Sequence, residues 1–358
     1  FVSAGVHGDE VIGVEIVRRL LQARGLKSLK GTLIVIPIVN TFGFINHSRY
    51  LPDRRDLNRS FPGSAHGSLA SRLANIFLNE IVSICDLGID LHSAAIGSGA
   101  VEDYKGHLYI GPSSWLICHV PFKKTDLFHN MGSLPSAIPG KYLLANEQEI
   151  AGEALNFLKE NIFFPDDELT PENLPEDVHG VFNKLAERIP PGSDKLIFTP
   201  WLYGERTPID DHTIRGGFHN MTLKTTRAHM IRAVFEGIAY NTRWLLKYVE
   251  AFIKKPMENI NFIGGGATSD LWCQIFADVL GRNIRQVKDP IEANVRGAGF
   301  LGSVAMGYLK FEEISEKIEF KAIYKPNPEN KNIYDELFDE YVCLYKKNRK
   351  IYSRLNRN

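Results

Sequence analysis

The chain has 358 residues, enough for two or three domains with a large buried core. Hydrophobic residues make up 44% and charged residues 23%, which is ordinary for a globular protein in water. Lys and Arg together number 42, as do Asp and Glu, so the formal net charge is zero. This balance argues against nonspecific nucleic-acid binding, which needs a strongly basic field.

Cysteine usage and hydropathy give the expected compartment. No apolar stretch approaches the roughly 20 residues that a membrane helix needs, so we expect no membrane partner. The cysteines form no CxxC pair and are far apart: Cys85, Cys118, Cys273 and Cys343. They indicate buried thiols in a reducing cytoplasm, so we expect a cytoplasmic protein. The chain starts at Phe1 within a strand-like stretch, and we expect it to be part of a longer protein.

The first 95 residues show the order of elements that is typical of a doubly wound α/β domain. Residues 1–6 predict a short buried strand, and residues 11–23 have apolar side chains at helical spacing. Residues 32–39 are almost all β-branched or apolar, which predicts a parallel strand covered on both faces. We then expect a polar loop, a helix and a second strand, over residues 40–67, 68–85 and 87–91.

Three side chains near strand ends form a candidate metal site. His7 and Glu10 follow the first strand three residues apart, and His92 ends a later strand. Zinc in hydrolases takes three N or O ligands and keeps one position for water. However, HxxE pairs are common by chance, and a lone histidine is more often a surface or core residue. The pair alone therefore gives weak support for zinc.

Three motifs surround these residues: FVSAGVHGDE at 1–10, RDLNRSFPG at 55–63 and DLH at 90–92. In this order they resemble the succinylglutamate desuccinylase/aspartoacylase family of carboxypeptidase-like zinc hydrolases. The resemblance implies a partial zinc-carboxypeptidase-like fold over residues 1–95. It also implies that Zn²⁺ is held by three of the residues named above, His7, Glu10 and His92.

The same resemblance implies a site for an N-acyl amino acid. Asn58 and Arg59 would grip a substrate carboxylate, and Arg49 or Arg55 would polarise the scissile carbonyl. A guanidinium fork suits a carboxylate because two N–H groups can bond both oxygens. The alternative for these arginines is a solvated cluster of ion pairs. Hydrolysis also needs a general-base glutamate from the later half of the family's catalytic domain, and nothing after Ile96 resembles that half.

Beyond residue 96 the pattern predicts further α/β structure. We expect strands over residues 105–110 and 260–263, and helices over 147–161, 226–252, 270–280 and 298–308. Gly264, Gly265 and Gly266 follow the second of these strands and open a helix. Glycines at such a turn let the backbone approach a nucleotide, and a helix N-terminus favours phosphate. The alternative is a tight strand-to-helix turn without a ligand.

Six motifs occupy this part of the chain: SGAV at 98–101, HLYIGPSSW at 107–115, TPWLYGERTP at 199–208, AVFEG at 233–237, GGGATSDLW at 264–272 and RGAGF at 296–300. They resemble the second domain of FGGY-family carbohydrate kinases, with xylulose kinases as the nearest type. The resemblance implies an actin-like, ribonuclease-H-like ATPase domain over residues 96–358. It further implies ATP and Mg²⁺ as cofactors and transfer of the γ-phosphoryl group to a sugar hydroxyl.

The kinase resemblance also assigns site residues. Gly111, Ser113 and Ser114 would line the phosphates. Gly265, Gly266 and Ala267 would hold the adenosine, and Gly264 belongs to the same nucleotide-binding turn. Asp90 falls at the position of the family's catalytic base, whereas in a zinc hydrolase it would merely precede the ligand His92.

The chain departs from the kinase pattern in two respects. Pro112 stands where the family usually has threonine, and proline has no N–H, so one phosphate contact is lost. The family's first kinase domain, which carries most of the sugar site, is absent, and no Asp-x-Gly-Thr turn precedes residue 96. We expect ATP to bind weakly, because the cleft lacks its other wall.

The main hypothesis is therefore a nucleotide-binding sugar-kinase half over residues 96–358, a phosphotransferase. The second is a zinc amidohydrolase with its partial domain over residues 1–95. The third is a non-enzyme, made of two half-domains whose exposed edges and apolar faces aggregate. The junction reflects a genuine gene fusion or a chimera made in sequence assembly, and the sequence is silent on oligomeric state.

Overall fold

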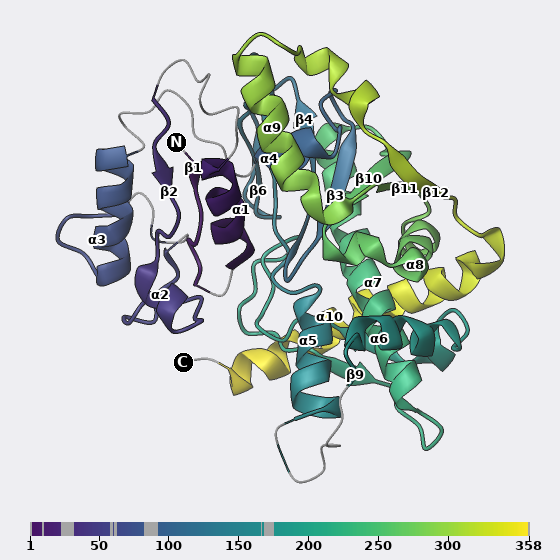
Figure 1. The fold of residues 1–358 in the computed structure, drawn as a ribbon. Helices are drawn as coiled ribbons and strands as arrows, with labels where there is room; N and C mark the ends of the chain where they lie inside the picture. The colour runs from purple at the N-terminus through teal and green to yellow at the C-terminus, as the bar shows by residue number, and fades with distance from the viewer. Residues whose placement is uncertain are drawn as a thin grey trace. The chain divides into compact units, whose positions relative to one another are not determined.

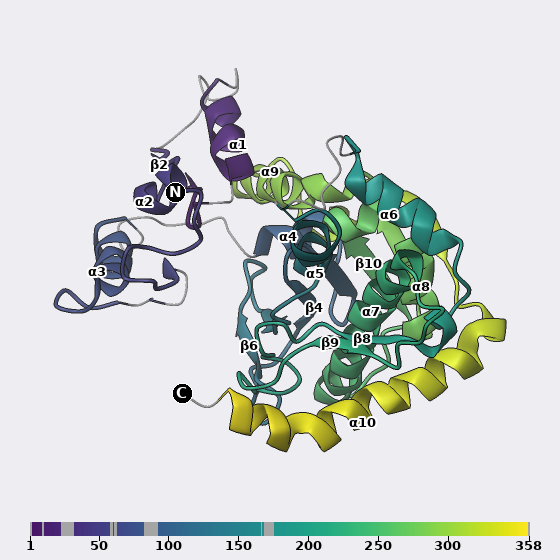
Figure 2. The ribbon, with the colours of Figure 1, turned by 90° about the horizontal axis from the view of Figure 1, so that it is seen from below.

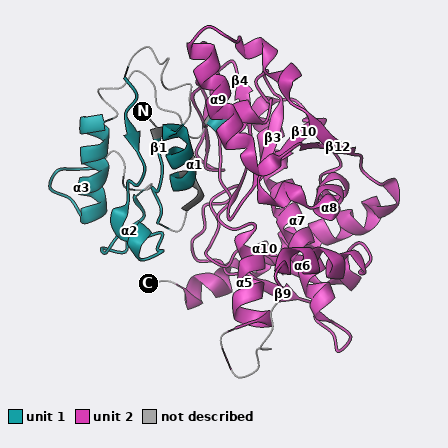
Figure 3. Cartoon of the chain, viewed as in Figure 1, with its two compact units in different colours: residues 1–93 teal, residues 94–358 magenta. Residues whose placement is uncertain are grey.

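The structure is a computed structural model that describes residues 2–8, 11–22, 32–57, 60, 63–81, 92–165, 167 and 175–356. The chain divides into two compact units, Phe1–Ser93 and Ala94–Asn358 (Figure 3). None of the described helices combines the length and the apolar character that a bilayer crossing requires.

Unit 1 contains a pair of parallel strands and short helices (Figure 1). β1 (Val2–Ser3) pairs with β2 (Val35–Ile36). The helices are α1 (Val11–Leu21), α2 (Thr41–Ile45) and α3 (Leu69–Ile76), and α3 continues into the π-helical turn Phe77–Ile81. A small core joins the loop to α3 through Val39, Leu51, Leu57, Ala70 and Ala74. The strand expected over residues 1–6 and the helices expected over 11–23 and 68–85 are confirmed in type, and the strand expected over 32–39 is reduced to Val35–Ile36. The loop expected over 40–67 is wrong at its start, because Thr41–Ile45 form α2, which Asn40 caps. The strand expected over 87–91 lies outside the described residues.

Unit 2 is organised around a mixed sheet that has eight strands within the described residues. The order is β12-β11-β10-β3-β4-β7-β6-β5. The neighbours β3, β10 and β11 run parallel, and the other neighbouring pairs are antiparallel. The strands are β3 (Gly106–Ile110), β4 (Ser114–Val120), β5 (Thr125–Asp126), β6 (Met131–Pro135), β7 (Tyr142–Ala145), β10 (Asn259–Ile263), β11 (Asn283–Val287) and β12 (Phe320–Tyr324). A separate pair joins β8 (Ile197–Thr199) to β9 (Gly217–His219).

The described helices of this unit are α4 (His92–Gly97, which begins at the unit boundary), α5 (Glu153–Leu158), α6 (Val178–Glu187), α7 (Arg227–Ile253), α8 (Asp270–Leu280), α9 (Ala293–Ala305) and α10 (Lys331–Leu355). Alternation along β3 assigns them to the two faces of the sheet. Leu108 and Ile110 join the large core that contains α7 and α8, whereas Tyr109 packs against a cluster with Ala94 of α4 and Ala293 of α9. The mixed α/β fold expected from the sequence is confirmed.

α7 is the central helix of unit 2. Apolar residues occupy most of its circumference, and a helix of this kind is stable when other elements cover it on most sides. It packs against α6, α8 and β8, and Figure 2 shows α10 alongside it at the outside of the unit. The expected helix over 270–280 is confirmed residue for residue as α8. The helix expected over 147–161 begins only at Glu153. The N–H groups of the preceding residues Gln148, Ala151 and Gly152 instead donate to carbonyls of residues 111–114, at the link between β3 and β4.

Candidate functional site

Two short turns leave the carboxyl ends of β3 and β10. β3 ends at Ile110 and is followed by the turn of residues 111–113, and β10 ends at Ile263 and is followed by Gly264. The two strands are parallel neighbours, with Ile263 opposite Tyr109. The turns therefore lie side by side at one edge of the sheet, where ligands of open α/β sheets bind.

The three glycines of the second turn have different surroundings. A Cβ on Gly264 would lie 2.5 Å from the carbonyl oxygen of Ile110, and a Cβ on Gly266 would lie 2.6 Å from Ile110 Cγ2. Gly264 also has a φ of +88°, which favours glycine. A Cβ on Gly265 would meet nothing within 4 Å, and this residue is exposed. Two glycines thus allow close packing, and the third presents open backbone.

Backbone donors are available at this turn. The N–H of Gly264 donates to Pro290, whereas those of Gly265 and Gly266 have no acceptor among the described residues. They begin the 3₁₀ turn Gly265–Thr268 that leads into α8. N–H groups at the start of a helical turn bind phosphate oxygens well, so this arrangement fits a nucleotide. The side chain of Ala267, by contrast, lies in the core.

The turn of residues 111–113 offers fewer donors than its sequence suggests. The N–H of Gly111 donates to the Ser113 carbonyl (3.0 Å). The Ser114 hydroxyl is buried and donates to Gln148 Oε1 at 3.2 Å. Pro112 has no N–H, and its carbonyl accepts the N–H of Ala151 at 2.7 Å. Ser113 is partly exposed, and within the described residues its N–H and hydroxyl have no hydrogen-bond partner.

A polar residue of α6 also reaches the glycine turn. Asn183 Oδ1 accepts the hydroxyl of Ser269, the residue that caps α8. Neither Asn183 nor Gln148 belongs to a recognisable motif. The sequence could not identify them, because each acts through a contact with a distant segment.

Residues 204–208 (GERTP) take part in a buried polar network next to Gln148. Glu205 is fully buried and accepts the N–H of Glu149 and the side-chain amide of Asn241. Burial raises the pKa of the Glu205 carboxyl to about 8, an effect opposed by the hydrogen bond from Asn241. Arg206 forms ion pairs with Glu147 and Glu149. The loop is thereby fastened to the segment that contains Gln148.

Unit 1 places two of the predicted site residues in one chain of polar contacts. His7 is buried, and its Nε2 lies 2.9 Å from Asp56 Oδ1, while Arg49 Nε lies 3.0 Å from Asp56 Oδ2. A carboxylate that fixes the ring of a histidine is a common support for a metal ligand. Asp56, which the sequence placed in a motif without a role, is therefore the organiser of this cluster. Arg55 is exposed, and its backbone N–H bonds Asp53.

Several predicted residues lie outside the described part of the chain: Glu10, Asn58, Arg59 and Asp90. His92 begins α4, but its side chain is also outside that part. Within the described ranges, no group of three or more His, Cys, Asp or Glu side chains is placed to share a metal ion. Of the proposed zinc ligands, only His7 therefore has a described environment.

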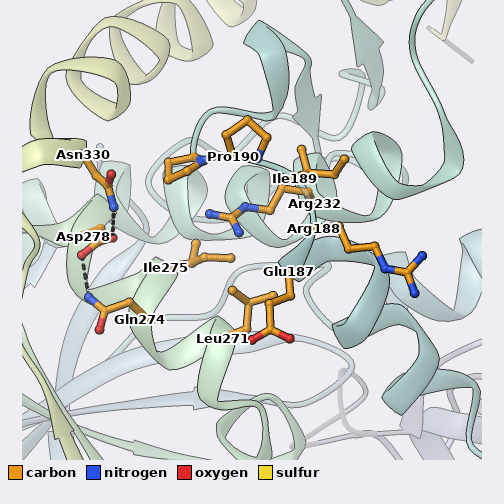
Figure 4. A pocket seen from close by; sticks show the side chains of 11 residues that line it. Glu187, Arg188, Ile189, Pro190, Arg232, Leu271, Gln274, Ile275, Asp278 and Asn330 are labelled. Carbon is orange, nitrogen blue, oxygen red and sulfur yellow. Dashed lines mark hydrogen bonds between the residues drawn. The ribbon is translucent and has the colours of Figure 1, made fainter.

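A separate hollow of about 370 Å³ lies between the end of α6, α7, α8 and the start of α10 (Figure 4). Its polar lining residues are hydrogen-bonded to one another or to a neighbouring carboxylate. Asp278 accepts Gln274 and Asn330, each at 2.7 Å, and Arg232 donates to Glu236. None of the glycine-turn residues lines it. Its lining includes residues of α8, the helix that follows the glycine turn.

Comparison with known proteins identifies the family. The sequence model of the FGGY family of carbohydrate kinases, C-terminal domain, matches residues 119–306. The chain belongs to the FGGY family of carbohydrate kinases. The model of the succinylglutamate desuccinylase/aspartoacylase catalytic domain matches residues 1–107. Both resemblances expected from the motifs are thus confirmed.

Relatives within the FGGY family include kinases of two named types. A xylulose kinase of Staphylococcus epidermidis is 31% identical over 297 residues, 82% of this chain and 56% of that protein. A gluconokinase of Bacillus licheniformis is 33% identical over 176 residues, 49% of this chain and 34% of that protein. The crystal structure of gluconate kinase from Lactobacillus acidophilus matches with a TM-score of 0.64 at 28% identity, covering 74% of this chain and 51% of that one. The chain spans about half the length of the curated relatives it matches.

Proposed function

We propose that residues 96–358 bind ATP at the adjoining turns after β3 and β10 and act as the nucleotide-binding half of a sugar kinase. The observation that carries this proposal is the pair of turns at one sheet edge, with unbonded N–H groups on Gly265 and Gly266 and open space at Gly265. The FGGY family membership supports it. The reaction is phosphoryl transfer from Mg-ATP to a hydroxyl of a sugar such as xylulose.

Different residues would contact the phosphates and accept the proton. The kinase resemblance assigns Gly265 and Gly266 to the adenosine; because their N–H groups are unbonded, we propose instead that these groups, with the N–H and hydroxyl of Ser113, bind phosphate oxygens. Bound Mg-ATP supplies the phosphoryl group. Asp90 would accept the proton of the attacking hydroxyl. Since the chain covers about half of its kinase relatives, we propose that turnover needs the complementary kinase domain from another chain.

The test uses two leucine substitutions at glycines that have open space around them. Gly265→Leu fills the space above the turn and is expected to raise the Kd for Mg-ATP at least about tenfold, equal to about 1.4 kcal/mol. Gly302→Leu, in α9, is the matched control and should leave the Kd unchanged, since a Cβ there also meets nothing within 4 Å. Titration calorimetry gives both values. No ATP binding by the unaltered chain, or equal affinities for both variants, would overturn the proposal.

A second candidate function is zinc-dependent hydrolysis of an N-acyl amino acid by residues 1–95. The contact of His7 with Asp56 at 2.9 Å favours it, together with the match to the desuccinylase/aspartoacylase domain. In this proposal His7, Glu10 and His92 hold Zn²⁺, and Asn58 with Arg59 holds the substrate carboxylate. His7→Ala should abolish stoichiometric zinc measured by metal analysis, and unchanged zinc content would remove this candidate.

A further inference from the structure

We propose that Gln148 is a positioning residue that holds Ser114, the first residue of β4, and thereby fixes the preceding turn of residues 111–113 for phosphate binding. The inference rests on the proposed nucleotide site. Gln148 is 1% exposed and precedes α5 by a few residues. No sequence motif marks it.

The backbone and side chain of Gln148 both hold Ser114. The N–H of Gln148 donates to the Ser114 carbonyl at 2.8 Å, and the N–H of Ser114 donates to the Gln148 carbonyl at 3.2 Å. The Ser114 hydroxyl donates to Gln148 Oε1. These bonds turn the Ser114 side chain away from solvent. Ser113 is thus left as the residue that presents its hydroxyl at the turn.

The other end of the Gln148 amide is anchored in the protein interior. Its Nε2 donates to the carbonyl of Asn241 in α7 at 2.8 Å and lies 3.4 Å from the carbonyl of Thr207. Asn241 is itself held, because its side chain donates to Glu205 and accepts Tyr341. A single amide therefore links the turn to the buried centre of α7. Glutamate cannot replace it fully, because a carboxylate lacks the donor that Asn241 and Thr207 receive.

The segment after Gln148 supports the turn from a second position. The N–H groups of Ala151 and Glu153 donate to the Pro112 carbonyl, and that of Gly152 donates to Gly111. A Cβ on Gly152 would lie 2.6 Å from the Gly111 carbonyl oxygen, so the two backbones are in close contact. Residues 148–153 therefore determine where the turn lies. Gln148 contributes the side-chain part of that support.

Asn146 provides a matched control. Its Nδ2 donates to the Leu116 carbonyl at 2.6 Å, and its Oδ1 accepts the Leu116 N–H at 3.0 Å. Asn146 thus holds β4 by hydrogen bonds to Leu116, two residues after Ser114, and within the described residues it makes no hydrogen bond to the turn of residues 111–113. Asn146→Leu should lower stability as Gln148→Met does and leave nucleotide affinity unchanged.

The experiment measures Mg-ATP affinity by titration calorimetry and amide hydrogen exchange of residues 111–114, in the full chain. Gln148→Met is expected to raise the Kd about tenfold and to speed exchange in the turn, whereas Asn146→Leu changes neither. Gln148→Glu, which keeps the acceptor for Ser114, should lie between them and serves if the Met variant does not fold. Ser114→Ala should weaken binding less than Gln148→Met.

Two results would overturn the inference. One is equal exchange in the turn of the Gln148→Met and Asn146→Leu variants. The other is a larger loss of affinity in Ser114→Ala than in Gln148→Met, which would mean that Ser114 binds phosphate directly. If the unaltered chain binds no ATP, the proposed function fails, while the exchange comparison still decides whether Gln148 positions the turn.

Discussion

Asn241 donates a 2.6 Å hydrogen bond from its side-chain amide to the carboxyl group of Glu205 in the interior of unit 2. The carboxyl group belongs to an irregular loop, and the amide belongs to the central helix α7. The bond therefore connects the loop to the largely buried central helix of the unit. It also fixes the position of a titratable group whose protonation affects stability.

Glu205 should make unit 2 less stable as the pH rises. Burial raises its pKa in the folded state to about 8 from 4.5, so the folded state binds a proton that the unfolded state releases. The contribution is complete below pH 4.5 and is lost as the pH approaches 8. Glu205→Gln should flatten this loss, with each pKa unit worth about 1.4 kcal/mol at most. The free energy of unfolding in urea, measured at pH 5 and pH 8, tests this prediction. An identical change with pH for the unaltered chain and the Glu205→Gln variant would contradict it.

His107 should contribute to acid sensitivity with the opposite sign. This fully buried histidine of β3 has ring nitrogens without hydrogen-bond partners among the described residues, and burial lowers its pKa to about 3 from 6.5. The neutral ring is compatible with folding above pH 6.5, and stability is lost as the pH falls toward 3. His107→Leu removes the buried polar atoms and should lose less stability over that range. Thermal melts at pH 7 and pH 4.5 provide the measurement, and a steeper loss in the variant would show the prediction to be wrong.

Gly264→Ala should destabilise unit 2 more than Gly281→Ala. Both glycines have positive φ, +88° and +62°, but only a Cβ on Gly264 would overlap a backbone atom, the carbonyl oxygen of Ile110. Strain of this kind costs about 1–3 kcal/mol, and overlap adds to it, whereas Gly281 only ends α8. Denaturant unfolding compares them. Equal losses would mean that the turn moves away from β3.

Arg232→Met should be strongly destabilising because it leaves a buried carboxylate without its cation. Arg232 Nε lies 2.7 Å from Glu236 Oε1, with side-chain exposures of 6% and 1%. Breaking such a pair costs about 3–5 kcal/mol. Lys288→Met, which breaks the exposed pair with Glu319, is the control and should have a much smaller effect. Similar shifts in Tm for both variants would contradict the prediction.

The sequence predicted local elements well where one pattern dominates. The helix over 270–280 is expected from its apolar spacing, and the structure has these bounds, with Ser269 and Gly281 as its caps. The glycine turn was also located correctly, because glycines after a buried strand constrain the backbone locally. By contrast, the start of α5 and the role of Gln148 depend on contacts with β4 and α7, distant segments that no local pattern encodes. The burial of the Ser114 hydroxyl has the same origin.

The pairing of β3 with β10 has a consequence for biosynthesis. These strands are neighbours in the sheet, yet most of unit 2 separates them along the chain, including the whole of α7. During synthesis β3 leaves the ribosome long before its parallel partner β10 has been made. The strands from β3 to β7 can pair with one another first, and the edge of β3 that will bind β10 then has no partner. Late closure of this kind slows folding and invites aggregation of unfinished chains. Recovery of folded material should therefore depend on chaperones and growth temperature.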